Sequence, residues 1–341
     1  MARSGPKPSG SAHRYTSCEG GDQTAGRHRS LPPDRDRLQP IPAFDIAQSE
    51  RGPSEPVGLR PKCDANAAGI AVDLHCRLPV FQYAASPGGW VTFPGGQLTL
   101  DAAADVSIPG VTLPGRTYNS RFNRWIPVPW AWVSGDNARY AYVGADNTVH
   151  AVDIATGKDS AIAGARDMVI IGFEGDAIYT KRTSGNELWR ISPSTGSVVQ
   201  VLNNGSWQRV GHGNAWGSTF SQLPLVRADL RTAGTELWYT RGPVVSVFGV
   251  DPTGRPVVEV GPTDGRGGNI MVVLAVDQGD IISPADTPPT PRIFENTWPA
   301  PSDSHGVWLA ANDGIYLVIP AAVPFMVKVS DVRAVPVGTC N

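Results

Sequence analysis

One short corner recurs along the chain and constrains its fold more than any other feature. The corner has an Asp or Ser followed by Thr-Gly, and it lies between two runs of β-branched and aromatic residues: DIATGK (153–158), SPSTGS (192–197) and DPTGRP (251–256). Asp and Ser side chains bond the backbone at such turns, and the glycine supplies a positive φ angle. Strands punctuated in this way predict an all-β fold.

A second kind of corner precedes an aromatic strand in each unit. Its members are SGDNARYAYV (134–143), FEGDAIYT (173–180), AGTELWYT (233–240) and ANDGIYLV (311–318). Two corners in a fixed order predict meanders of about four strands that repeat every ~40–50 residues, which is typical of the blades of a β-propeller. The 265 residues from Cys76 to Cys340 then predict about six blades, and five or seven also fit. A pair of two-sheet sandwiches is the competing architecture, and it does not explain the recurring order.

The first part of the chain differs in composition from the rest. All ten tryptophans lie at or after Trp90, and the segment before Cys76 is rich in Ser, Gly, Pro and Arg. Such a segment buries too little apolar surface to offset the entropy of ordering. We therefore expect a disordered extension over 1–75 and a propeller over 76–341.

The distribution of apolar residues contains no export or membrane segment. The start of the chain has no apolar core of the kind that a signal peptide requires. The longest apolar run, 315–327, is broken by Pro320 and Pro324 and is too short for a transmembrane helix. We expect no membrane span in this chain.

The cysteines nevertheless favour an oxidising compartment. Cys76 begins the predicted folded body and Cys340 lies at its end, which suggests a disulfide that joins the two ends. Disulfides persist in secreted and periplasmic proteins. The alternative is that the two are unrelated free thiols.

Net charge and residue spacing exclude several classes of function. Lys and Arg number 29 and Asp and Glu number 31, so the basic excess that nucleic-acid binding needs is missing. No Cys or His spacing is typical of a zinc site, and the acidic metal set of a quinone-dependent dehydrogenase is missing. We predict a monomer without metal or cofactor.

Several segments resemble a family of propellers. SGDNARYAYV is similar to an element of Tol-associated and WD-repeat-like propellers. CRLPVF, SRFNRWIPVPWAWVS, WYTRGPVVSVFGVDPTGRPVV, DSHGVWLAANDGIYL and KVSDVRAVPVGTC resemble an uncharacterised family of bacterial extracytoplasmic propeller proteins. The resemblance covers most of 76–341. It implies a propeller, an oxidised compartment and a Cys76–Cys340 bond, and it implies no activity.

Two groups of residues are candidates for ligand binding. Arg121, Arg124 and Trp125 lie close to Trp130 and Trp132 in a short segment, where an exposed aromatic could stack a sugar or planar ligand and the arginines could hold an acid. The alternative is that Trp130 and Trp132 share one strand face and pack between blades.

The second group is Asp303 and His305 in the sequence DSHG, which contains the residue types of a hydrolase triad. Adjacent side chains on a strand point to opposite faces, so these residues alone cannot form a triad. The alternative is a structural hydrogen-bond set in front of the strand GVWLAA, and we predict no catalytic residue.

The most consistent interpretation is a non-catalytic, secreted or periplasmic scaffold that binds a protein or a small molecule. The alternative is a propeller hydrolase or lyase that acts on extracellular glycan or peptide. An acidic cluster with a histidine at the mouth of the channel would favour the enzyme.

Overall fold

The computed structural model describes residues 72–81, 88–112, 115–220, 223–239, 244–260, 271–277, 280–282, 300–321 and 325–341. The chain divides into two units, Met1–Lys62 and Cys63–Asn341, and the described residues all belong to the second. The sequence predicts disorder over 1–75, and residues 1–71 of this range lie outside the described part. In the described residues no helix is long and apolar enough to cross a membrane.

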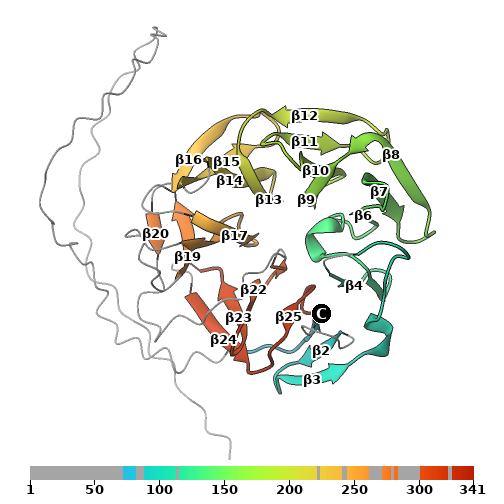
Figure 1. Ribbon diagram of the computed structural model, residues 1–341. Coiled ribbons are helices and arrows are strands. Elements are labelled where there is room, and N and C mark those ends of the chain that lie inside the picture. The colour runs from blue at the N-terminus through green and yellow to red at the C-terminus, as the bar shows by residue number, and fades with distance from the viewer. Residues whose placement is uncertain are drawn as a thin grey trace, which may run out of the picture. The chain divides into compact units, whose positions relative to one another are not determined.

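The described chain is all-β, as predicted, and five of its antiparallel sheets have four strands each (Figure 1). The first sheet contains β25 (Val335–Pro336), β1 (Arg77–Phe81), β2 (Gly89–Thr92) and β3 (Gln97–Leu100). The second contains β9 (Met168–Glu174), β10 (Ala177–Arg182), β11 (Leu188–Ile191) and β12 (Val198–Leu202). The third contains β13 (Ser206–Gly211), β14 (Asn214–Phe220), β15 (Leu223–Asp229) and β16 (Thr235–Tyr239).

The other two four-stranded sheets complete five blades, one of the numbers that the sequence allows. They contain β17 (Val244–Val250), β18 (Pro256–Val260), β19 (Met271–Asp277) and β20 (Asp280–Ile282), and β21 (Ser302–Asp303), β22 (Gly306–Ala311), β23 (Gly314–Ile319) and β24 (Phe325–Ser330).

Two smaller sheets lie in sequence between the first blade and the second. One is the hairpin β4 (Thr117–Asn119) and β5 (Arg124–Ile126), and the other is β6 (Arg139–Val143), β7 (Thr148–Asp153) and β8 (Asp159–Arg166). An isolated antiparallel β-bridge pairs Val133 with Tyr140 of β6. The 3-10 turns η1 (Ala102–Ala104) and η2 (Trp130–Trp132) complete the described elements.

The sheets follow one another around a ring in chain order (Figure 1). Neighbouring sheets contact one another through β6, β9, β13, β17, β22 and β25 in turn. This arrangement of meanders is a β-propeller, in which each blade buries its faces against the next blade.

Strand β22 shows how the blades bury each other. All six of its residues are buried. Val307 and Leu309 pack against Phe248 of β17, whereas Trp308 packs against Leu78 of the first blade. Because successive side chains point to opposite faces, a strand between two blades needs the unbroken apolar run GVWLAA.

The two ends of the described chain meet in the first blade, as predicted. Strand β25 pairs with β1, and the Cys76–Cys340 disulfide joins residues 264 positions apart. The pairing continues beyond β25, because Arg77 N donates to Asn341 O at 2.8 Å and Asn341 N donates to Arg77 O at 3.1 Å.

The prediction of a fixed corner order is wrong. The Thr-Gly corners at 153–158 and 192–197 join the two outer strands of their sheets, β7 to β8 and β11 to β12. The corner at 251–256 instead joins β17 to β18, the inner strands of its blade. The turn chemistry is local, so the same corner can occupy either place in a meander.

The expected strand at Trp130 and Trp132 is also wrong, because these residues form η2. Pro129 precedes the turn, and Val133 N closes it on Trp130 O. A 3-10 turn has three residues per turn, so the alternation of a strand does not apply to this pair.

Candidate functional site

Trp125 is buried in the structure. It lies on β5 with 5% of its surface exposed, and its ring contacts those of Trp90 and Tyr118 at centroid distances of 5.6 and 5.5 Å. Its Nε1 donates to Asp101 Oδ2 at 2.9 Å, and Trp90 Nε1 donates to the same oxygen at 3.0 Å. These contacts hold the hairpin against the first blade. Ligand binding by Trp125 stays a prediction.

The carboxylate between the two indoles predicts a pH dependence. The hydrogen bond from Trp125 lowers the pKa of Asp101, and the bonds from Trp90 and Ala103 N lower it further. A carboxyl with a lowered pKa in the folded protein stabilises above its unfolded pKa, and this contribution is lost as the pH falls through the folded value. We expect Asp101→Asn to reduce the loss of unfolding free energy between pH 6 and pH 3, measured by urea titration of tryptophan fluorescence.

The matched control is Asp176→Asn. It removes the same charge from a side chain that is 75% exposed. The Oδ1 atom of Asp176 lies 3.4 Å from Nη2 of Arg190. If Asp101→Asn loses as much unfolding free energy on acidification as the unaltered protein, the Asp101 carboxylate does not contribute to the pH dependence of stability.

Arg121 and Arg124 lie on the β4–β5 hairpin, and both are exposed. Arg124 and Trp125 are neighbours on β5, so their side chains point to opposite faces and Arg124 stays outside when Trp125 is buried. The guanidinium carbons of Arg121 and Arg124 lie 5.3 and 5.9 Å from the centroid of the Phe122 ring. The structure therefore brings the two arginines together around Phe122 and separates them from the indole.

Asp303 and His305 belong to a different sheet from the arginines. Asp303 Oδ1 accepts from His305 N at 2.8 Å and lies 3.1 Å from its Nδ1. Oδ2 accepts from Trp308 Nε1 and from Cys340 N, both at 2.8 Å. In the fold this carboxylate connects β21, β22 and the disulfide segment, and ligand binding by the pair stays a prediction.

One cluster of acidic residues with a histidine lies on outer strands of its sheet. His150 lies on β7. Its Nδ1 is 2.9 Å from Oδ1 of Asp159 on β8, and its Nε2 is 3.6 Å from Oδ1 of Asp146 in the preceding turn. Its ring stacks on that of Tyr142 at 4.8 Å, and Tyr142 also donates to Asp159. The sheet order is β6-β7-β8 with β6 next to β9, so His150 and Asp159 lie on the two outer strands, whereas Tyr142 lies on β6.

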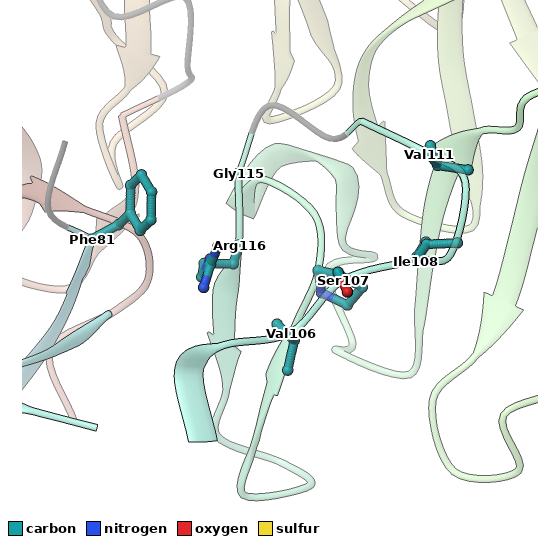
Figure 2. A pocket seen from close by; sticks show the side chains of 8 residues that line it. Phe81, Val106, Ser107, Ile108, Val111, Gly115 and Arg116 are labelled. Carbon is teal, nitrogen blue, oxygen red and sulfur yellow. The ribbon is translucent and has the colours of Figure 1, made fainter. Parts of the chain in front are cut away.

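A small pocket lies between the end of β1 and the segment that leads into the hairpin (Figure 2). Its volume is about 130 Å³. The lining is mostly apolar, with one arginine and one serine: Phe81, Val106, Ser107, Ile108, Val111, Gly115, Arg116 and Pro127. Figure 2 shows the Arg116 side chain between Phe81 and the 106–111 segment.

Arg116 is the charged group of the pocket. Its guanidinium carbon lies 4.9 Å from the Phe81 ring centroid. Nη1 donates to Ala104 O and lies 3.6 Å from Asp105 Oδ1. The Arg116 side chain is 20% exposed, whereas that of Asp105 is 82% exposed. The cation is therefore fixed in place, and its acidic neighbour lies largely in solvent, where the pair is screened.

Sequence reasoning missed this pocket. Phe81 and Arg116 come from separate segments that meet because β1 and β4 lie side by side. The sequence signal was weak: apolar residues such as Ile108 and Val111 punctuate a segment rich in Pro and Gly, VSIPGVTLPGRTY. Among the described side chains, no three His, Cys, Asp or Glu gather in a group that could hold a metal ion.

Comparisons with known proteins leave the family open. No protein-family model matches the chain, and no curated protein matches it. TolB from Acinetobacter baumannii is 13% identical with a TM-score of 0.40, over 76% of this chain and 67% of TolB. An oligogalacturonate lyase in complex with manganese is 13% identical with a TM-score of 0.41, over 74% of this chain and 72% of the lyase.

An acylaminoacyl peptidase from Pyrococcus horikoshii is 12% identical with a TM-score of 0.40, over 60% of this chain and only 39% of the peptidase. These similarities are too low to carry a functional argument. The propeller assignment rests on the sheet topology of this chain.

Proposed function

We propose that this chain is a non-catalytic, extracytoplasmic propeller scaffold whose ligand or protein partner places a small anionic group in the pocket beside Arg116. One observation carries the proposal: a guanidinium held in place on Phe81 lines a cavity whose other walls are mainly apolar. Ligand sites of proteins commonly combine apolar walls with a few placed polar groups.

The hydrogen bonding of Arg116 suits an anion. A guanidinium has five N–H donors, and its interactions with Ala104 and Asp105 both use Nη1. A carboxylate that enters the pocket can therefore accept from the remaining donors, and such charge-assisted bonds are about twice as strong as neutral ones. The ring of Phe81 keeps the guanidinium plane in one orientation.

The volume limits what enters. The pocket measures about 130 Å³. This is below the ~300–1,000 Å³ of sites that enclose a drug-sized ligand. The pocket therefore takes one group, such as a short carboxylate or a single side chain of a partner.

The disulfide supports an extracytoplasmic location. The Cys76–Cys340 bond joins the ends of the described propeller, and a structural disulfide of this kind persists in an oxidising compartment.

The bonds of Asp303 support a binding role over a hydrolase. Both of its carboxylate oxygens are occupied by donors from His305, Trp308 and Cys340. A general acid or base needs an oxygen within hydrogen-bond reach of the reacting group. Here both oxygens instead bond groups of the fold itself, namely His305, Trp308 and Cys340.

The test is binding of butanoate, measured by NMR chemical-shift titration, with butanamide as its neutral analogue. We expect butanoate to bind and Arg116→Met to weaken its binding about tenfold or more, because charge-assisted bonds contribute ~1.5–3 kcal/mol. Val111→Phe should weaken it by filling the pocket, and Arg190→Gln on the distant β11 should not.

Thermal unfolding of each variant separates loss of binding from loss of fold. Equal binding of butanoate to the unaltered protein and to a folded Arg116→Met variant would disprove the role of the guanidinium. Equal binding of butanoate and butanamide to the unaltered protein would disprove anion selection.

A further inference from the structure

A second basic surface lies at the tip of the β4–β5 hairpin. Arg121 and Arg124 flank Phe122, and both guanidinium groups lie within 6 Å of its ring centroid, at 5.3 and 5.9 Å. The Arg121 side chain is 53% exposed. We call these three residues the arginine tip.

The carboxylate of Asp136 lies beside Arg121 at the arginine tip. Arg121 Nη1 donates to Asp136 O at 2.8 Å and lies 3.9 Å from Asp136 Oδ2. Hydrogen bonds from Ser134 and Ala138 lower the pKa of Asp136, and the charges of Arg121 and Arg139 lower it further. Asp136 therefore stays ionised, but its Oδ1 is already bonded by Ser134 Oγ at 2.7 Å and Ala138 N at 3.0 Å.

Arg124 contributes a further charge beside β6. Burial and the negative charge of Asp159 raise the pKa of Tyr140, and the positive charge of Arg124 opposes that rise. Arg139 on β6 lies near two carboxylates, Asp136 and Asp153, so the exposed cations of this surface are Arg121 and Arg124. The two exposed guanidinium groups of the arginine tip are electrostatically complementary to an anionic partner.

The stacking on Phe122 prepares the arginines for carboxylates. A guanidinium over an aromatic ring is held by its face, so its N–H donors in the plane remain directed outward. These donors form a fork that matches both oxygens of a carboxylate. The side chains therefore lose little freedom when they bind.

The chemistry of Phe122 favours an acidic protein segment over an acidic sugar. Phe122 packs against the cluster that contains Ile126 and Val128, and the two guanidinium groups cover the ring. Phe122 is half-buried, so its ring is not an exposed platform of the kind on which a sugar stacks. The residues lie on an exposed turn rather than in a cavity, which suits an extended segment lying across the surface.

We propose that the arginine tip docks an extended acidic segment of a partner protein, with carboxylates that bind Arg121 and Arg124. Alternate side chains of an extended segment lie on one side and are about 7 Å apart, so a Glu-Gly-Glu pattern presents two carboxylates together. This docking does not rest on the pocket beside Arg116.

The test uses a fluorescent peptide with the sequence Gly-Glu-Gly-Glu-Gly-Glu-Gly and its Gln counterpart, with binding measured by anisotropy at 20 and 150 mM NaCl. We expect the Glu peptide to bind, to bind less tightly at the higher salt, and to lose at least tenfold in affinity in the Arg121→Gln/Arg124→Gln variant. The Gln peptide should not bind.

The matched control is Arg190→Gln/Arg231→Gln, which removes the same charge from other blades and should leave the affinity within twofold. Phe122→Leu keeps both arginines and removes the ring, so we expect an intermediate loss. Arg116→Met should leave peptide binding unchanged, which separates this surface from the pocket.

Three results would overturn the proposal. The first is absence of binding by the Glu peptide to the unaltered protein. The second is equal loss of affinity in the control and in the Arg121→Gln/Arg124→Gln variant, which would indicate attraction by net charge alone. The third is preferential binding of heparin over the peptide at equal charge concentration, with a loss in the same variant, which would assign the arginine tip to a polysaccharide.

Discussion

Replacing Cys76 and Cys340 together by serine is expected to lower the free energy of unfolding by about 2–5 kcal/mol, because the bond closes a very long loop in the unfolded chain. The bond joins residues 264 positions apart, and the contribution of a disulfide increases with the length of the loop it closes. The measurement is urea unfolding followed by tryptophan fluorescence.

The strand pairing at the same place decides how the variant unfolds. Strand β25 has only two residues, and it pairs with Val80 and Phe81 of β1. Without the disulfide, we expect hydrogen exchange at the backbone amides of Arg77 and Asn341 to accelerate before the other blades are affected.

Two comparisons control this experiment. A reductant should destabilise the unaltered protein by the same amount and have no effect on the double serine variant. Replacing Cys18 and Cys63, which lie outside the described residues, should leave the unfolding free energy unchanged. A double serine variant as stable as the unaltered protein would show that the strand pairing alone holds the two ends together.

Asp303→Ala is expected to cost about 3–5 kcal/mol, since it leaves two buried N–H donors without their acceptor. The Asp303 side chain is 8% exposed. Its loss leaves Trp308 Nε1 and Cys340 N without their acceptor, and each unsatisfied buried donor costs ~1–3 kcal/mol. Urea unfolding at pH 7 provides the measurement.

Neighbouring variants separate the two oxygens of Asp303. Asp303→Asn keeps one acceptor oxygen and turns an amide toward the other donors, so we expect an intermediate loss. His305→Ala should cost less than ~1 kcal/mol, because the His305 side chain is 34% exposed and exposed pairs contribute little. A loss for His305→Ala that matches Asp303→Ala would move the stabilising role to the histidine.

The fold could be predicted because its signals are local. Turn residues such as Thr156-Gly157 and Thr195-Gly196 mark where strands end, and Gly157 and Gly196 take φ angles of 69° and 71°. The position of a corner within its blade could not be predicted. Gly254 ends a Thr-Gly corner with a φ of 89° between the inner strands, because packing of whole strands selects that place.

The disulfide was predictable from its place at the two edges of the folded region, and the candidate site was predictable only in part. Arg121 and Arg124 are exposed, as a ligand-binding role requires. The burial of Trp125 follows from Asp101, a partner 24 residues away. The pocket needs Phe81 and Arg116 to meet across two sheets, and such pairings depend on tertiary packing, which a single sequence does not reveal.

The make-up of the first blade has a consequence for biosynthesis. Strand β1 precedes β25 by more than 250 residues, yet both belong to one sheet. While the ribosome is still extending the chain, that sheet lacks its innermost strand and the Cys76 thiol lacks its partner. Contacts between residues this far apart in sequence make folding slow. The first blade therefore stays incomplete until the last residues have been synthesised. Until then the Cys76 thiol has no Cys340 with which to form its disulfide.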